Sequence, residues 1–332
     1  MDRRDFLRTT GAAAALAGSG LLSSSAFAAR TPGPGDVVKV THPGMMGRQF
    51  PVPEIAREMV FTAVQRLTGE SDPGRAFGHF VSAGDKVGVK VNCLAGRFSS
   101  TSREVAYAVV EGVRRAGVPD GNITIVDQYP WALLQARYLA PDLAGAVRTV
   151  HHDEVADAFT DEFRLLGCRV RWAKNFLACD KIISVPVIKD HNLTGITCAF
   201  KNIACGVIDA PPRIHRAIHE VMPRLYASDQ VRSRVSLIVT DASVIQYSNG
   251  PKVDLEFRKP LHTVYATTDP VAMDAIARDV VEAARAERRL PSIVRQNRAP
   301  RYIDVGAAMG LGVADAARMR VDEVTLGAAA PG

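Results

Sequence analysis

Short apolar, β-branched runs alternate along this chain with longer stretches whose apolar residues recur at helical spacing. Apolar and polar or small residues alternate over 86–91, which predicts a strand. A helix over 102–116 follows, with Ser102 at its N-cap position, and a second strand is predicted over 123–126. We expect this strand–helix–strand unit to form a right-handed parallel crossover.

The same alternation continues to the C-terminus. Strands are predicted over 37–41, 169–172, 181–188, 235–239, 261–266 and 321–326, and helices over 53–67, 131–138, 215–225 and from 270 toward 288. This pattern predicts an α/β fold with a largely parallel or mixed sheet and helices on both faces. Ligands of such sheets bind at the C-terminal ends of the strands, so we expect the site there.

Polar side chains stand where these predicted strands end. Lys90 and Asn92 close one strand, and Lys189 and His191 follow the strand over 181–188. A helical pattern after Thr194 then carries Lys201 and Asn202. Lysine ammonium groups, amides and a helix N-terminus around one cleft would bind phosphate, carboxylate or sulfate. Alternatively, the three lysines form a buried network without a ligand, each paired with one of Asp127, Asp190, Asp209, Asp241 or Asp269.

Cysteine and histidine spacings suggest further chemistry. Cys198 shares the predicted helix face with Lys201, so it is a candidate nucleophile or ligand, or else an inert buried cysteine. His215 and His219 are four residues apart on a predicted helix. That spacing suits two ligands of one metal ion, although two unrelated surface histidines give the same pattern. The candidate metal ligands are therefore His215, His219 and Cys198.

The N-terminus carries a targeting pattern. Arg3-Arg4-Asp5-Phe6-Leu7-Arg8 precedes a weakly apolar run, and Ala26-Phe27-Ala28 offers a cleavage site after Ala28. We predict a twin-arginine signal peptide over 1–28, a linker over 29–36 and one α/β domain over 37–330. The protein would then use the twin-arginine translocase and reside in the periplasm or outside the cell. A chance basic N-terminus before an Ala-rich helix is the alternative.

Composition narrows the function classes. Without residues 1–28 the chain has 38 Lys+Arg and 33 Asp+Glu, a net charge of +5, and the excess is scattered without interleaved aromatic residues. This disfavours nucleic-acid binding. No run of 18 apolar residues follows the leader, so we expect no transmembrane helix in the mature protein. The five cysteines contain no C-x-x-C pair. One disulfide is possible in an oxidising compartment, without a preferred pair, and at least one thiol should stay free unless a partner or metal takes it.

No standard cofactor motif is present. The sequence lacks a ferredoxin-type cysteine motif, a G-x-G-x-x-G after a strand and a G-x-x-x-x-G-K-[ST] loop. The cofactor therefore stays unknown, and a metal ion remains an option.

The ordered set of polar strand ends resembles the domain-of-unknown-function family 362 (DUF362) of bacterial proteins. The set comprises Lys90-Val91-Asn92, Lys189 with His191, Lys201-Asn202, His215, Asp241, Asn249-Gly250-Pro251 and Asp269-Pro270-Val271-Ala272-Met273-Asp274. The resemblance covers roughly 84–280 and implies an α/β domain with these motifs near one cleft. Some relatives carry iron–sulfur modules, which hints at redox chemistry, but this chain has no such module.

Two hypotheses follow. The first is an exported enzyme acting on a small anionic substrate, in a redox version with a bound metal or cofactor. His191 or His215 would move a proton, and Asp241 or Asp269 would orient a lysine or histidine. The second is an envelope protein that binds a solute or metal without turnover. The candidate catalytic residues are His191, His215, Lys201 and Asp241; the candidate substrate-binding residues are Lys90, Asn92, Lys189, Asn202 and Asp269.

Overall fold

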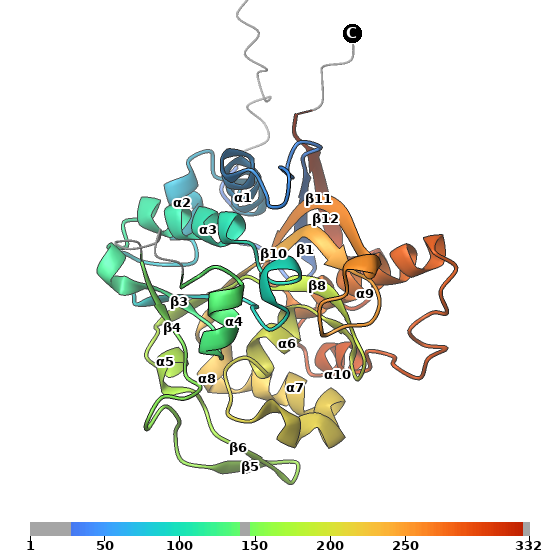
Figure 1. The fold of residues 1–332 in the computed structure, drawn as a ribbon. Helices are drawn as coiled ribbons and strands as arrows, with labels where there is room; N and C mark the ends of the chain where they lie inside the picture. Colours follow the sequence, from blue (N-terminus) through green and yellow to red (C-terminus); the bar gives the residue numbers. More distant parts are fainter. Residues whose placement is uncertain (1–27, 140–146, 328–332) are drawn as a thin grey trace, which may run out of the picture.

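One mixed sheet forms the centre of the computed structural model, which describes residues 28–139 and 147–327 (Figure 1). Within these residues ten strands join it, in the order β12-β1-β11-β10-β7-β2-β3-β4, with β8 pairing beside β10 and β9 beside β8. Their bounds are β1 Asp36–Thr41, β2 Val87–Lys90, β3 Ile123–Val126, β4 Arg148–Val150, β7 Lys181–Ser184, β8 Val187–His191, β9 Gly195–Thr197, β10 Val235–Gln246, β11 Arg258–Thr267 and β12 Arg320–Thr325. A separate hairpin joins β5 (Phe163–Leu165) to β6 (Cys168–Val170).

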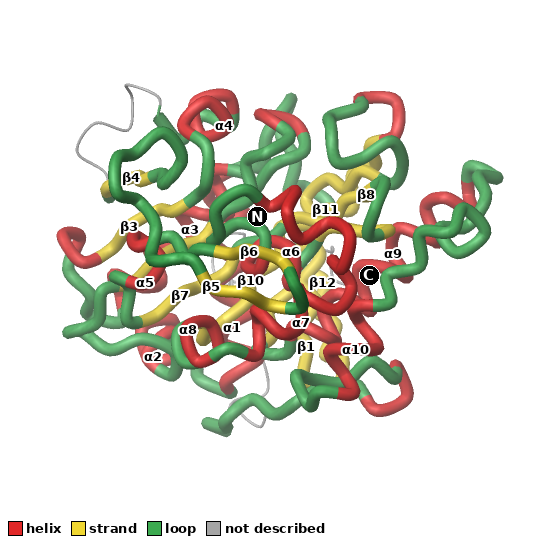
Figure 2. The backbone as a smooth tube through the Cα atoms, turned by 90° about the horizontal axis from the view of Figure 1, so that it is seen from below, coloured by secondary structure: helices red, strands yellow, loops and turns green. Residues whose placement is uncertain are grey.

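Most neighbouring strands in the sheet are parallel, as predicted. The pairs β2–β3, β2–β7, β7–β10 and β3–β4 are all parallel. Strand β11 runs antiparallel to both β10 and β1. Its C-terminus therefore lies on the side of the sheet where β2, β3 and β7 have their N-termini. In Figure 2 the row of strands runs from β4 and β3 at one side toward β1 and β12.

Helices cover both faces of the sheet, which confirms the predicted α/β class. Side chains alternate between faces along each strand, so Ile183 packs in one apolar layer and Ile182 in the other. The first layer holds α1 (Pro53–Thr68), α2 (Pro73–Gly78), α3 (Arg103–Arg115) and α4 (Pro130–Gln135). The second holds α5 (Lys174–Leu177), α6 (Ala199–Ala204), α7 (Ile218–Ala227), α8 (Asp229–Arg232), α9 (Pro270–Glu287) and α10 (Tyr302–Ala308).

The strand predicted over 181–188 is in fact two strands. β7 ends at Ser184, and β8 begins at Val187, after Pro186, which has no N–H to donate to a ladder. β8 then runs beside the second half of β10, and β9 turns back along it. Lys189 and His191 therefore lie within a strand, and the helix predicted after Thr194 begins only at Ala199.

The segment before β1 is fixed to the domain. The Arg30 amide donates to the Thr68 carbonyl at 2.7 Å, and the Gly35 amide donates to Asp269 Oδ2 at 2.8 Å. The predicted linker over 29–36 is thus not a free tether. The predicted signal peptide lies outside the described residues except for Ala28. Across the described ranges no helix combines the length and apolar character needed to span a membrane.

Candidate functional site

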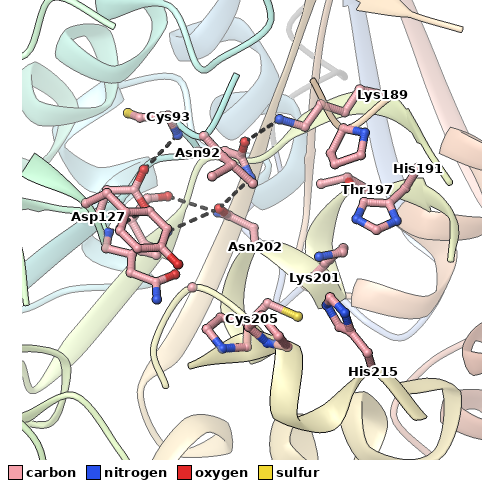
Figure 3. A pocket seen from close by; sticks show the side chains of 18 residues that line it. Asn92, Cys93, Asp127, Lys189, His191, Thr197, Lys201, Asn202, Cys205 and His215 are labelled. Atoms are coloured by element: carbon pink, nitrogen blue, oxygen red, sulfur yellow. Dashed lines mark hydrogen bonds and ion pairs between the residues drawn. The ribbon is translucent and has the colours of Figure 1, made fainter. Parts of the chain in front are cut away.

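A pocket of about 190 Å³ lies where β2 and β3 end. Its other sides come from β8, β9, α6 and the 3₁₀ helix over Pro211–Ala217. Seven of the residues selected from the sequence line it. Figure 3 labels all of them except Lys90, and the labelled side chains surround one space. The seven residues are Lys90, Asn92, Lys189, His191, Lys201, Asn202 and His215. The expected placement at strand ends therefore brings most of the candidates together.

Lys90 forms one side of the pocket, and its ammonium group is fully occupied. Its Nζ donates to the Val91 carbonyl at 2.6 Å, to Asp127 Oδ1 at 2.8 Å and to Asn202 Oδ1 at 3.3 Å. An ammonium group has three N–H bonds, so these three acceptors use all of them. For Lys90 the paired, structural interpretation of the lysines is the one that the contacts support.

Asp127 and Asn202 are equally well bonded. Asp127 Oδ2 accepts the Cys93 amide at 2.7 Å, and Asn202 Nδ2 donates to the Lys90 carbonyl at 3.1 Å and to Ser184 Oγ at 3.0 Å. A Cβ on Gly206 would lie 2.7 Å from Lys90 Nζ, so the chain needs glycine beside this group. We call Lys90, Asp127 and Asn202 the paired wall.

Lys201 stands on the opposite side and has no such partners. Its side chain enters the pocket from α6 and is only 9% exposed. Nowhere in the described ranges does another residue form a hydrogen bond or an ion pair with its ammonium group. Instead, Lys201 lowers the pKa values of Lys189, His191 and His215, which shows that these basic groups lie close to one another. We call Lys189, His191, Lys201 and His215 the cationic wall (Figure 3).

His191 is held as a neutral hydrogen-bond donor. Its Nδ1 accepts the amides of Leu193 at 3.1 Å and Thr194 at 3.3 Å, so this geometry assigns the ring proton to Nε2. Burial, then Lys201 and Lys189, lower the His191 pKa to about 2. The expectation that His191 moves a proton near neutral pH is not supported, because its free nitrogen already carries one.

Lys189 is nearly inaccessible to solvent, at 1% exposure. Its Nζ donates to Asn92 Oδ1 at 2.8 Å and to the Ser99 carbonyl at 3.3 Å, and no carboxylate of the described chain pairs with it. Burial, followed by Lys201, lowers the Lys189 pKa to about 7. Nearby, Thr197 lines the pocket, and its buried Oγ1 lacks any partner among the described residues.

Asp241 and Asp269 lie outside the pocket, which corrects their expected place in the cleft. Asp241 lies within β10, which runs well past the predicted end at Val239, and its Oδ2 accepts both the amide and the hydroxyl of Ser102 at 2.7 Å. Asp269 follows the C-terminus of β11, which lies on the side of the sheet away from the pocket. It caps α9 by accepting the Ala272 amide at 2.8 Å. Within the described residues neither carboxylate orients a lysine or a histidine.

The three metal candidates do not come together. Cys198 is buried behind the pocket, where burial and then Asp274 raise its thiol pKa, so the expected thiolate is not favoured. His219 stacks on Tyr302 with ring centroids 6.0 Å apart, whereas His215 lies at the pocket. The predicted helix over 215–225 changes from 3₁₀ to α geometry after Ala217, which breaks the assumed spacing.

No group of three or more His, Cys, Asp or Glu side chains placed to hold a metal ion occurs in the described part of the chain. All five cysteines are buried and free.

Two aspartates outside the candidate list help to build the site. Asp127 could be noticed, because it directly follows the strand predicted over 123–126. Asp274 accepts the Ala199 amide at 2.6 Å and the Tyr302 hydroxyl at 2.8 Å, so it occupies the N-terminus of α6. Burial raises the Asp274 pKa to about 7. The helix N-terminus expected to attract an anion is therefore taken by the protein's own carboxyl group.

The fold and site define an α/β protein with buried lysines gathered in a pocket at its strand ends. The chain belongs to the family described as "Domain of unknown function (DUF362)", whose model matches residues 87–279, more than half of the sequence. No functionally curated protein matches the chain.

The solved structures that match this chain include two distantly similar proteins. The lactate racemase apoprotein from Thermoanaerobacterium thermosaccharolyticum has 13% identity and a TM-score of 0.40, over 71% of this chain and 55% of that one. A protein from Thermotoga maritima has 10% identity and a TM-score of 0.42, over 74% and 61%. The match thus spans less than two thirds of either structure.

Proposed function

We propose that this protein binds a small anion, most simply a carboxylate, against the cationic wall and acts on it as an enzyme. One observation carries the proposal: the Lys201 residue is only 9% exposed, and its ammonium group has no hydrogen-bond or ion-pair partner in the described chain. A charge in that position is costly unless something pairs with it. A ligand anion in the pocket would supply the missing partner.

Neighbouring donors suit the same ligand. His191 Nε2–H and the unpartnered Thr197 hydroxyl both belong to side chains that line the pocket beside Lys201. Hydrogen bonds from a charged donor to an anion are about twice as strong as neutral ones. The volume of about 190 Å³ restricts the ligand to a small molecule.

Titration calorimetry with acetate, phosphate and sulfate tests this proposal. We expect Lys201→Met to weaken the tightest of these anions by roughly 10- to 100-fold, because a hydrogen bond from a charged donor contributes about 1.5–3 kcal/mol. Lys86→Met removes an exposed lysine outside the pocket and should leave affinity unchanged. Equal affinity in the Lys201→Met protein would contradict the proposal, and unfolding of that variant would favour the paired, structural interpretation.

Binding without turnover is the second candidate function. It is favoured by the fixed donor state of His191, which removes one of the two expected proton carriers. A pure binder would return its anion unchanged. Following that anion by NMR during incubation with the protein separates the two functions, because new signals appear only if the anion reacts. We do not extend the proposal to redox or metal chemistry, because His215, His219 and Cys198 stand apart.

Export stays part of the proposal. Its support is the twin-arginine pattern at Arg3-Arg4 with a cleavage site after Ala28. A periplasmic or secreted protein should begin at Ala29, and mass spectrometry of its N-terminus checks this. An uncleaved N-terminus on protein recovered outside the cytoplasm would argue against the assigned signal peptide.

A further inference from the structure

Lys189 differs from Lys90 in the number and kind of its acceptors. Lys90 Nζ has three acceptors, one of them the Asp127 carboxylate. Lys189 Nζ has two, the Asn92 amide oxygen and the Ser99 carbonyl, both neutral. An ammonium group has three N–H bonds to place, whereas a neutral amine has two N–H bonds and a lone pair. The contacts of Lys189 match the neutral amine, with its lone pair left free.

The surroundings of Lys189 favour the same state. The side chain lies against the pocket at 1% exposure, beside the unpaired charge of Lys201. Burial disfavours a charged amine, and a second cation disfavours it further. Burial and Lys201 accordingly lower the Lys189 pKa to about 7. A neutral lysine amine next to another cation is a recognised way to obtain a nucleophile that attacks carbonyl carbon.

We infer that Lys189 is a nucleophile that forms an imine with a small oxo acid, that is, an aldehyde or ketone that also carries a carboxylate. The inference rests on the proposed function, because Lys201 would hold the carboxylate while Lys189 meets the carbonyl group. It adds the class of substrate and the reacting atom to that proposal.

The step balances without an oxidant or a reductant. The Nζ lone pair forms a bond to the carbonyl carbon, and the C=O π electrons move to oxygen. The oxygen leaves as water with the two hydrogens of the amine, which gives the C=N bond. Protonation of this imine restores one N–H, which can again donate to Asn92 Oδ1.

Reductive trapping tests the inference directly. The full chain is incubated at pH 7 with glyoxylate or pyruvate and cyanoborohydride, and the modified lysines are mapped by peptide mass spectrometry. We expect an adduct on Lys189 that saturates at low probe concentration and is suppressed by acetate. Lys90, whose three N–H bonds are occupied, should stay unmodified. Lys189→Arg should abolish the saturable adduct, and acetaldehyde, which has no carboxylate, should react far less.

The experiments distinguish imine formation at Lys189 from anion binding at Lys201. Acetate binding that depends on Lys201, without a Lys189 adduct from either oxo acid, would overturn the imine and leave anion binding intact. Absence of both would overturn both. An adduct only on exposed lysines, unaffected by acetate, also contradicts the inference.

A second measurement needs only the wild-type protein and two variants of Lys201, one without and one with a positive charge. The extent of acetylation of each lysine is followed against pH by mass spectrometry. We expect a half-maximum near pH 7 for Lys189, where it is about half neutral. Lys201→Met should move the Lys189 midpoint upward, because a neighbouring cation is lost, whereas Lys201→Arg should keep it. A Lys189 midpoint near the ordinary lysine pKa of about 10.4 would overturn the inference, even if Lys189→Arg fails to fold.

Discussion

The paired wall and the cationic wall accommodate buried lysines in opposite ways within one pocket. Lys90 is 1% exposed and donates to a carboxylate and two neutral oxygens. Lys189 is just as buried and Lys201 nearly so, yet neither contacts a carboxylate of the described chain. Burial alone therefore does not determine the state of these lysines; the partners supplied by neighbouring strands do.

The difference between the walls follows from the sheet. β2 and β3 are adjacent and parallel, so the residues at their C-terminal ends, Lys90 and Asp127, meet at 2.8 Å. β8 instead pairs with β10 and β9. The carboxylates on these strands are already bonded elsewhere: Asp241 accepts the Ser102 amide at the start of α3, and Asp190 pairs with Arg298 at 2.8 Å. No carboxylate of the described chain therefore pairs with Lys189 or Lys201, and that leaves the cationic wall free to hold an anion.

The largest effect is expected when the same substitution, lysine to methionine, is made on each wall. Lys90→Met should lower the free energy of unfolding by about 3–5 kcal/mol, because it leaves the Asp127 carboxylate buried without its partner. Lys201→Met removes an unpaired buried charge, so it should cost less than about 1 kcal/mol or stabilise the protein. Urea unfolding of both variants, followed by circular dichroism, gives the two values.

A double substitution serves as the control. Lys90→Met together with Asp127→Asn removes both charges and should regain part of the lost stability, because an amide oxygen still accepts the Cys93 or Gln128 amide. Equal destabilisation by Lys90→Met and Lys201→Met would mean that the two walls do not differ in the way proposed.

The sequence predicts the fold class well because hydrophobic periodicity is local. The unit over 86–126 has the predicted strand, helix and strand as β2, α3 and β3, within a residue or two at each end. Errors arise where distant contacts decide. Strand β10 extends to Gln246 because β8 and β11 pair with its second half, and no local pattern in the sequence announces that pairing.

The sequence likewise predicts those site residues whose positions depend on local patterns, and not those that depend on distant contacts. Lys90, Lys189, Lys201 and His215 follow from their places near strand ends and after the strand over 181–188, and all line the pocket. For Asp269 the same reasoning gives a wrong prediction. β11 is antiparallel to its neighbours, so its C-terminus lies on the side of the sheet away from the pocket. Which lysine is paired could not be predicted, because it depends on register between strands far apart in the sequence.

A smaller test concerns His215, the exposed member of the cationic wall. Partial burial and then Lys201 lower its pKa, so it is mostly neutral at pH 7 and gains a proton as the pH falls. A bound anion favours the protonated ring. Affinity for sulfate should therefore rise between pH 7.5 and 5.5, and His215 should contribute about two- to fivefold, as an exposed ion pair of up to about 1 kcal/mol does.

The His215 contribution has to be separated from that of Lys189, which takes up a proton in the same range because its pKa is about 7. Calorimetry with His215→Gln at constant ionic strength does this, since sulfate keeps its charge and Lys189 stays in place. The ratio of affinities at the two pH values should shrink in the variant by the same two- to fivefold. An unchanged ratio would show that His215 is not part of the anion site, and would restrict the cationic wall to Lys189, His191 and Lys201.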